Sequence, residues 1–138
     1  MNYKKIIVLM LCVFMGLNLW GCVQKNYSGE MDAVGSFTHA SENCYEESLI
    51  VVANKKEIPD YEEFAWEVVD HYLNNDFKTI LFNFDEQGYP YRLKATIYLH
   101  RDDIETGSVI FEMIYQAETY DYNVKDNPEK CDIEIITK

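Results

Sequence analysis

The clearest pattern in the chain is an apolar stripe with helical spacing between residues 61 and 73. The apolar positions recur three and four residues apart, which places them on one face of an α-helix: Tyr61, Phe64, Ala65, Val68, Val69, Tyr72 and Leu73. Asp60, with Glu63 three residues later, forms a capping-box-like start. The pattern predicts one amphipathic helix beginning after Asp60, with Trp66 at the margin of its buried stripe.

Around this helix, apolar and polar residues alternate, as they do in half-buried β-strands. A β-branched run predicts a strand at residues 48–54, and alternation predicts strands at 79–84, 91–100 and 109–115 and a last strand from Cys131. The stretch "DEQGYP" at residues 85–90 predicts a turn, so that 79–84 and 91–100 would form a hairpin. In the second of these strands the inward set would be Leu93, Ala95, Ile97 and Leu99.

These elements together predict an α+β fold in which one helix lies across an antiparallel meander of four to five strands. That layout resembles cystatin-like and nuclear-transport-factor-like helix-on-sheet folds, a likeness that implies no activity. A chain of 138 residues fits one domain. We expect this domain at residues 46–138, because residues 22–45 show neither helical nor strand periodicity and therefore favour a flexible tether.

The N-terminus has the layout of an export signal. Lys4 and Lys5 precede an almost wholly apolar run at residues 6–20, which Asn18 interrupts. A helix that spans a bilayer needs roughly 20 consecutive apolar residues, so a removable signal peptide is favoured over a permanent transmembrane segment.

The end of this run resembles the lipobox of bacterial lipoprotein signal peptides. Leu19 stands three positions before Cys22 and Gly21 immediately before it, whereas Trp20 occupies a position that usually holds a small residue. The resemblance implies that residues 1–21 are removed and that Cys22 carries the lipid. The chain would then be anchored on the extracytoplasmic face of the cell membrane, like the short Gram-positive lipoproteins of unassigned function that it resembles. An ordinary signal peptide cut elsewhere and an uncleaved anchor are the alternatives.

The exported part of the chain is strongly acidic. Only two of the 12 basic residues, Lys4 and Lys5, precede Cys22, which leaves 10 basic against 24 acidic residues and a formal net charge of −14. Such a surface repels phosphate backbones, so we expect no nucleic-acid partner.

Metal, cofactor and nucleophile motifs are not recognisable in the sequence. His39, His71 and His100 are widely spaced, and no pair of histidines or cysteines has zinc-ligand spacing. A Gly-rich phosphate loop and a G-x-S-x-G nucleophile motif are also missing. We therefore expect no metal, no cofactor and no catalytic residues.

Two cysteines would remain in the processed protein. In an exported chain, Cys44 and Cys131 form an even pair and are a candidate disulfide. Two unbridged thiols are the alternative.

A candidate partner surface follows from the alternation in the strand at residues 91–100. If its apolar set faces the helix, the other sheet face gathers basic and aromatic side chains with isoleucines from the next strand: Arg92, Lys94, Tyr98, His100, Ile110 and Ile114. Trp66, at the margin of the helix, is a further candidate contact. In the alternative, Lys94 and Glu112 merely neutralise each other on a solvated face.

These features predict a lipid-anchored cell-surface binding module that is not catalytic and whose protein or carbohydrate ligand the sequence does not name. The alternative is a small surface hydrolase with a cleft between helix and sheet.

Overall fold

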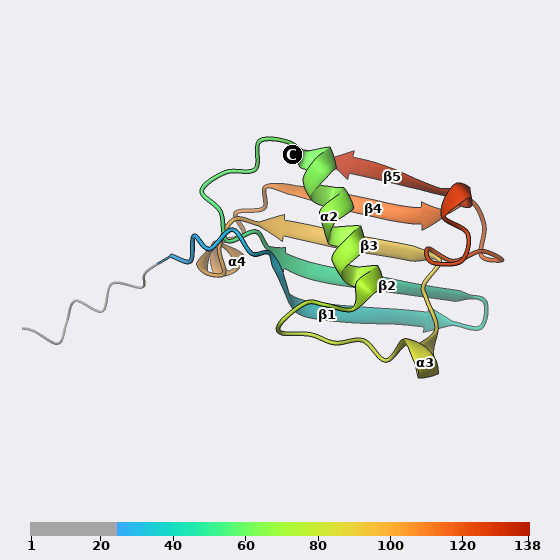
Figure 1. Cartoon of the computed structure of the whole chain (residues 1–138). Coiled ribbons are helices and arrows are strands. Elements are labelled where there is room, and N and C mark those ends of the chain that lie inside the picture. The colour runs from blue at the N-terminus through green and yellow to red at the C-terminus, as the bar shows by residue number, and fades with distance from the viewer. Residues whose placement is uncertain (1–24) are drawn as a thin grey trace, which may run out of the picture.

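A computed structural model describes residues 25–138 of the chain, so the signal segment and Cys22 lie outside the described residues. The described part is an α+β domain in which one long helix lies on a five-stranded sheet (Figure 1). Its elements are β1 (Asp32–Ser41), β2 (Cys44–Val52), α2 (Tyr61–Asn74), α3 (Phe84–Gln87), β3 (Arg92–Tyr98), α4 (Asp102–Thr106), β4 (Phe111–Ala117), a 3₁₀ turn (Pro128–Lys130) and β5 (Cys131–Ile136). No helix within residues 25–138 is both long and apolar enough to cross a bilayer.

The strands lie in the order β1-β2-β3-β4-β5, and the sheet is mixed. Every neighbouring pair is antiparallel except β2 and β3, which run parallel from Glu46 beside Arg92 to Val52 beside Tyr98. The α+β class is confirmed, whereas the expectation of a purely antiparallel meander is wrong. A parallel pair needs a long crossover connection, and α2 with the segment after it supplies that connection.

Residues 79–84 do not form the predicted strand, so the predicted hairpin with residues 91–100 is wrong. Asn75, in the left-handed conformation that ends α2, clamps this segment instead. Its amide Nδ2 donates to the Phe82 carbonyl, and its Oδ1 accepts from the Phe82 backbone N–H, both at 2.8 Å. Phe82 and Phe84 then pack on Tyr72 at ring-centroid distances of 4.9 and 5.2 Å. The alternating phenylalanines therefore cover the end of the helix rather than a sheet face.

Strand β1 lies inside the segment that the sequence assigned to the tether. It pairs with β2 along its whole length, with a bulge between Ala33 and Gly35. A side chain at Gly35 would meet Ile50, whose Cδ1 lies only 3.2 Å from the position of an added Cβ. The outer half of β1, residues 36–41, is exposed, which explains why apolar alternation does not reveal this strand.

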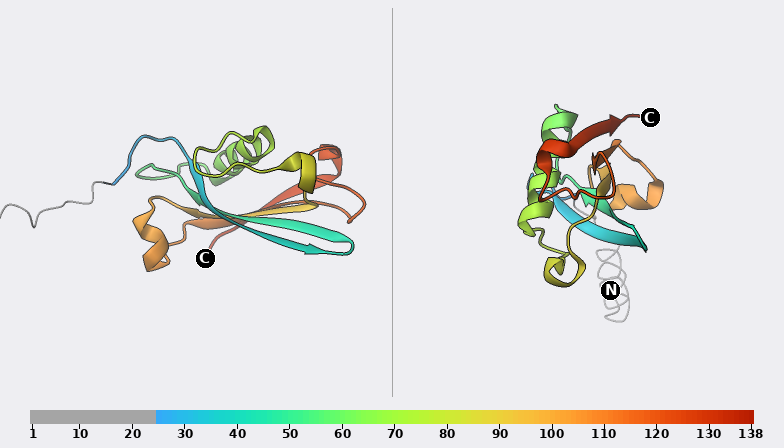
Figure 2. Two further views of the ribbon diagram at one scale, coloured as in Figure 1. Left: turned by 90° about the horizontal axis from the view of Figure 1, so that it is seen from below. Right: turned by 90° about the vertical axis from the view of Figure 1, so that its right-hand side faces the viewer.

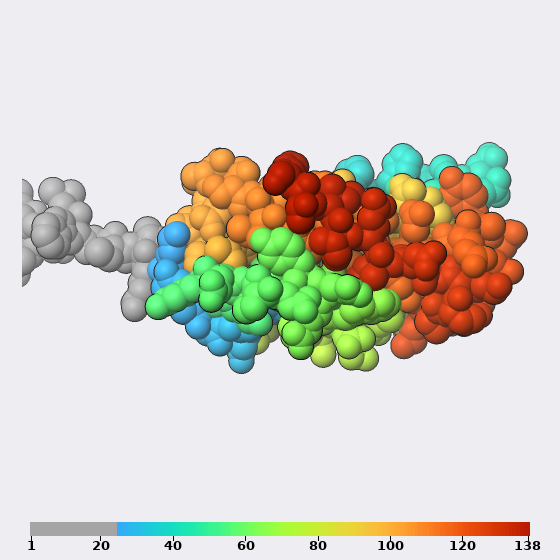
Figure 3. All heavy atoms as spheres, turned by 90° about the horizontal axis from the view of Figure 1, so that it is seen from above, coloured from blue at the N-terminus to red at the C-terminus, as the bar shows by residue number. Residues whose placement is uncertain are grey.

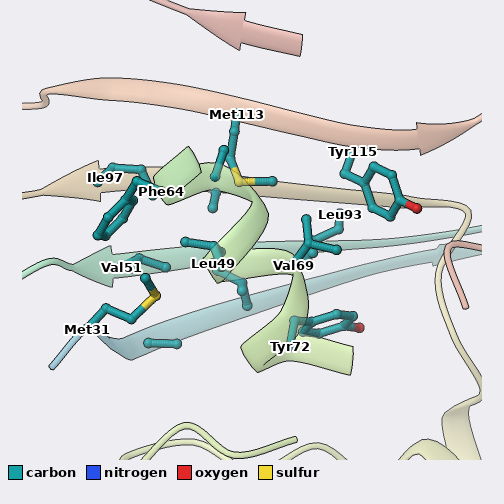
Figure 4. Packing of buried hydrophobic residues seen from close by; sticks show 14 of the residues in the cluster. Met31, Leu49, Val51, Phe64, Val69, Tyr72, Leu93, Ile97, Met113 and Tyr115 are labelled. Atoms are coloured by element: carbon teal, nitrogen blue, oxygen red, sulfur yellow. The ribbon is translucent and has the colours of Figure 1, made fainter. Parts of the chain in front are cut away.

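The core fills the space between α2 and the sheet. Asp60 caps the helix as predicted, since its carboxylate accepts from the Glu63 backbone N–H at 3.0 Å. Figure 4 shows the side chains of α2 meeting those of the sheet; the buried residues include Phe64, Val68, Val69 and Tyr72 from the helix and Leu49, Val51, Leu93, Ile97, Met113 and Tyr115 from the strands. The predicted inward set of β3 is confirmed for Leu93, Ala95 and Ile97, while Leu99 is only partly buried. Figure 2 shows α2 on one sheet face and the short α4 on the other.

Candidate functional site

The predicted basic stripe lies on the sheet face away from α2, where neighbouring strands neutralise it. The Arg92 guanidinium contacts the Glu46 carboxylate at 3.2 Å and donates to the Gln116 side chain at 2.8 Å. Lys94 lies 3.7 Å from Glu112. Both cations are therefore paired across strands, and the Lys94–Glu112 pair is the one that the alternative interpretation of this face expected. Tyr98 and Ile114 belong to the same face and are half-buried.

His100, Ile110 and Trp66 do not share that face. His100 follows the end of β3 and is only 4% exposed, with the ring of Tyr27 against it at 4.8 Å. Ile110 precedes β4 and packs on the core. Trp66 lies on α2, on the other side of the sheet, where it is 41% exposed and meets Tyr115 edge-on at 5.4 Å. The predicted partner residues thus belong to at least three separate places.

Cys44 and Cys131 are free thiols, and the structure does not bring them together. They lie on β2 and β5, with β3 and β4 between them. Three strand spacings amount to about 14 Å, whereas a disulfide requires Cα atoms within about 7 Å. Burial raises the pKa of both thiols, and at Cys44 the nearby Glu46 raises it further, so neither is an activated nucleophile.

The most distinctive surface feature is a pocket to whose lining five tyrosines contribute, here called the tyrosine pocket. Its volume is about 330 Å³, and three separate segments build it: the β1–β2 turn, the residues before β3 and the loop after β4. The five tyrosines are Tyr45, Tyr89, Tyr91, Tyr120 and Tyr122. Figures 1 and 3 show that these segments gather at the end of the sheet opposite the blue N-terminal part of the described chain. Since β1 runs ten residues between the two ends, about 30 Å separates them.

Several of these rings are held in place by aromatic neighbours. Tyr91 and Tyr120 meet edge-on at 4.5 Å, and Tyr89 stacks on Phe84 at 4.3 Å. Tyr120 is nevertheless 60% exposed, so its ring is available to a partner. Large rings with few rotatable bonds provide contact area at low entropic cost, as in protein and carbohydrate recognition.

A buried glutamate, Glu47, lies behind this pocket. Glu47 is 1% exposed, and its Oε2 accepts from the Tyr45 hydroxyl at 3.1 Å and from the Thr38 hydroxyl at 2.8 Å. Its Oε1 has no hydrogen-bond partner, and no ion pair with Glu47 occurs within the described part of the chain. Burial, with a smaller contribution from the Glu47 charge, raises the pKa of Tyr45 to about 12. The Tyr72 hydroxyl is also buried, and burial, followed by the neighbouring Tyr45 and the Glu47 charge, raises the pKa of Tyr72.

A second cavity of about 550 Å³, here called the N-terminal pocket, lies at the other end of the domain. His100 lines it together with Arg101, Asp102, Glu105 and Lys25. The His100 Nδ1 is buried without a partner. Among residues 25–138, no cluster of three or more histidine, cysteine or acidic side chains is placed to hold a metal ion.

The sequence carried only a weak signal for the tyrosine pocket. Eleven tyrosines are more than a small core can hide, and "GYPY" and "ETYDYN" place several of them in turns. Glu47 was missed because the predicted strand began one residue after it.

Comparison with known proteins assigns neither a family nor a function to the chain, because no family model, no curated protein and no solved structure matches it.

Proposed function

We propose that the chain is a lipid-anchored, non-catalytic binding module on the extracytoplasmic face of the cell membrane, and that it holds its partner in the tyrosine pocket. The observation that carries this proposal is the position of the pocket. It lies about 30 Å from the end of the domain where residue 25 joins the proposed anchor. A site at that distance is presented outward from the membrane, where a surface partner can reach it.

The aromatic lining of the pocket also supports the proposal. The exposed Tyr120 and its four neighbouring tyrosines provide aromatic area of the kind that recognition surfaces use. We also propose that the domain shares the helix-on-sheet layout of cystatin-like and nuclear-transport-factor-like folds, a likeness that implies no activity.

The anchor is tested by the intact mass of the protein extracted from membranes. We expect a chain that begins at diacylated Cys22, and a Cys22→Ser variant that is released or left unprocessed, because only the thiol can form the thioether. Two or more acyl chains are needed for stable anchoring. A mature chain that begins at any other residue would contradict the lipoprotein part of the proposal.

The binding site is tested by cross-linking on intact cells followed by mass spectrometry. Wild type is compared with Tyr91→Ala/Tyr120→Ala, which alters the tyrosine pocket, and with Tyr98→Ala/Ile114→Ala, which alters the open sheet face. We expect the first variant to lose partners that the second retains. If the Tyr98→Ala/Ile114→Ala variant alone loses partners, the binding surface is the open sheet face. If both variants capture the same partners as wild type, the margin around Trp66 is the remaining candidate binding surface.

A small surface hydrolase is the second candidate, because His100, whose Nδ1 is buried without a hydrogen-bond partner, lines the N-terminal pocket together with Asp102 and Glu105. The cleft that this alternative placed between helix and sheet is filled by the core. The hydrolase must therefore work in the N-terminal pocket. Chromogenic ester and glycoside substrates test it, since wild-type turnover that disappears in His100→Gln would favour the enzyme.

A further inference from the structure

The ionisable side chains that line the tyrosine pocket, apart from the tyrosines and one thiol, are acidic. Glu42 and Asp121 belong to its lining, which contains no lysine, arginine or histidine. Glu47 lies behind the Tyr45 ring, buried and without a cation. A buried carboxylate with no positive partner is costly for a fold, so its presence next to an open pocket points to a ligand that supplies the missing charge.

The tyrosine rings themselves attract positive charge, because the face of an aromatic ring is electron-rich. Three of the five already have a cation of the chain beside them. Arg92 lies 5.3 Å from the centroid of Tyr91, and two lysines approach the other two rings: Lys130 to Tyr122 at 5.9 Å and Lys125 to Tyr89 at 6.0 Å. Across residues 25–138, neither Tyr45 nor Tyr120 has such a neighbour. Of the five rings, those of Tyr45 and Tyr120 therefore lack a cation within the described chain, and the ring of Tyr120 is 60% exposed.

The negative net charge of the whole domain also favours binding of a cation. Residues 22–138 carry a formal net charge of −14. A field of this sign raises the local concentration of positively charged molecules and speeds their association.

We propose that the tyrosine pocket binds an organic cation, a primary ammonium or guanidinium group carried either by a polyamine or by a lysine or arginine side chain of a partner. This inference rests on the proposed binding function and names the chemical class of its ligand. The rings of Tyr45 and Tyr120 contact the cation, and Glu42 and Asp121 accept its hydrogen bonds. Glu47 strengthens the negative potential from behind the Tyr45 ring.

The test is isothermal titration of the full chain, purified in a neutral detergent, with four probes. They are spermine, a peptide of alternating lysine and glycine, the same peptide with every lysine acetylated, and a neutral oligosaccharide. Acetylation removes the charge and keeps the length, so the third probe is the matched control for the second. We expect the lysine peptide to bind and the acetylated one not to bind; spermine distinguishes a small-molecule source of the cation from a peptide source.

Variants separate the pocket from diffuse attraction to an acidic surface. Tyr120→Ala leaves the net charge unchanged and should weaken cation binding about three- to thirtyfold, the range for one cation–π contact. Tyr27→Ala is the matched control, since Tyr27 is 51% exposed at the opposite end of the domain. Circular dichroism checks that both variants fold.

Three results would overturn the inference. Equal affinity of wild type and Tyr120→Ala for the lysine peptide would mean that the attraction is diffuse. Binding of the acetylated peptide or the oligosaccharide that depends on Tyr120 would mean that the pocket takes an uncharged ligand, and the proposed binding function would stand. If none of the probes binds, organic cations are excluded as ligands, while the cross-linking comparison decides the binding function separately.

Discussion

Replacing Glu47 with glutamine should stabilise this protein, although the residue is fully buried in the native structure. The change keeps the size and shape of the side chain and removes its charge. In the native domain Glu47 is 1% exposed, has no ion-pair partner in the described part of the chain and leaves Oε1 without a hydrogen bond. Its interactions are the bonds from Thr38 and Tyr45 to Oε2, at 2.8 and 3.1 Å.

Two opposing contributions set the change in the free energy of unfolding caused by Glu47→Gln. Burying a charge without a partner costs several kcal/mol, a cost that the amide avoids. Against this, two hydrogen bonds to a charged acceptor, worth about 1.5–3 kcal/mol each, become neutral bonds worth about 0.5–1.5 kcal/mol each. We expect a net increase of about 1–2 kcal/mol in the free energy of unfolding, or roughly 4–10 °C in the melting temperature.

Urea unfolding of wild type, Glu47→Gln and Glu46→Gln measures this change. Glu46 is the adjacent carboxylate, but it is partly exposed and paired with Arg92, so losing its charge should lower stability by no more than about 1 kcal/mol. A loss of more than about 1 kcal/mol in Glu47→Gln would show that the carboxylate holds the fold together through Thr38 and Tyr45. A stabilised Glu47→Gln variant that binds cations less well would instead identify a residue retained for function at a cost in stability.

Three other predictions concern the clamp, the tyrosines and the thiols. Asn75→Gly keeps the left-handed backbone but deletes both 2.8 Å bonds to the crossover segment, so urea unfolding should show a loss of about 1–2 kcal/mol, and an unchanged midpoint would contradict the clamp. Burial is the main cause that raises the pKa of Tyr45 and of Tyr115 to about 12, from about 10 in the unfolded chain. Their contribution to stability is therefore complete below about pH 10 and is lost as the pH rises through about 12; urea midpoints should fall over that range, and less steeply in Tyr115→Phe. Cys44 and Cys131 should both be alkylated in the unfolded chain without reductant, and a linked Cys44–Cys131 peptide in the mass spectrum would contradict the observed strand order.

Local patterns in the sequence were sufficient for the helix and for the inward face of the central strands. The helix depends on residues three and four apart and on the bond from Asp60 to Glu63, all of which are close in sequence. The buried sets of β3 and β4 follow from alternation alone, because successive side chains of a strand point to opposite faces.

Strand pairing depended on tertiary contacts that local patterns do not contain. The phenylalanines at 82 and 84 alternate like strand residues, yet they pack on Tyr72 because the helix end offers them an apolar surface nearby. With that segment outside the sheet, β3 pairs with β2, and the crossover through α2 makes the pair parallel. Strand β1 is held by hydrogen bonds to β2 more than by an apolar face of its own, so its exposed outer half resembles a tether in sequence.

The sequence by itself determined the acidity, which follows from composition, and it determined the helix and the alternating faces, because each of these is a property of neighbouring residues. Only the tertiary structure decided the tyrosine pocket, since its rings come from three segments that the folded sheet brings to one end. The tertiary structure also decided that Glu47 is buried. In sequence this residue is one of many acids, but it shares its strand face with Leu49 and Val51, and α2 covers that face. Burial depends on what packs above a residue, which is a property of distant parts of the chain.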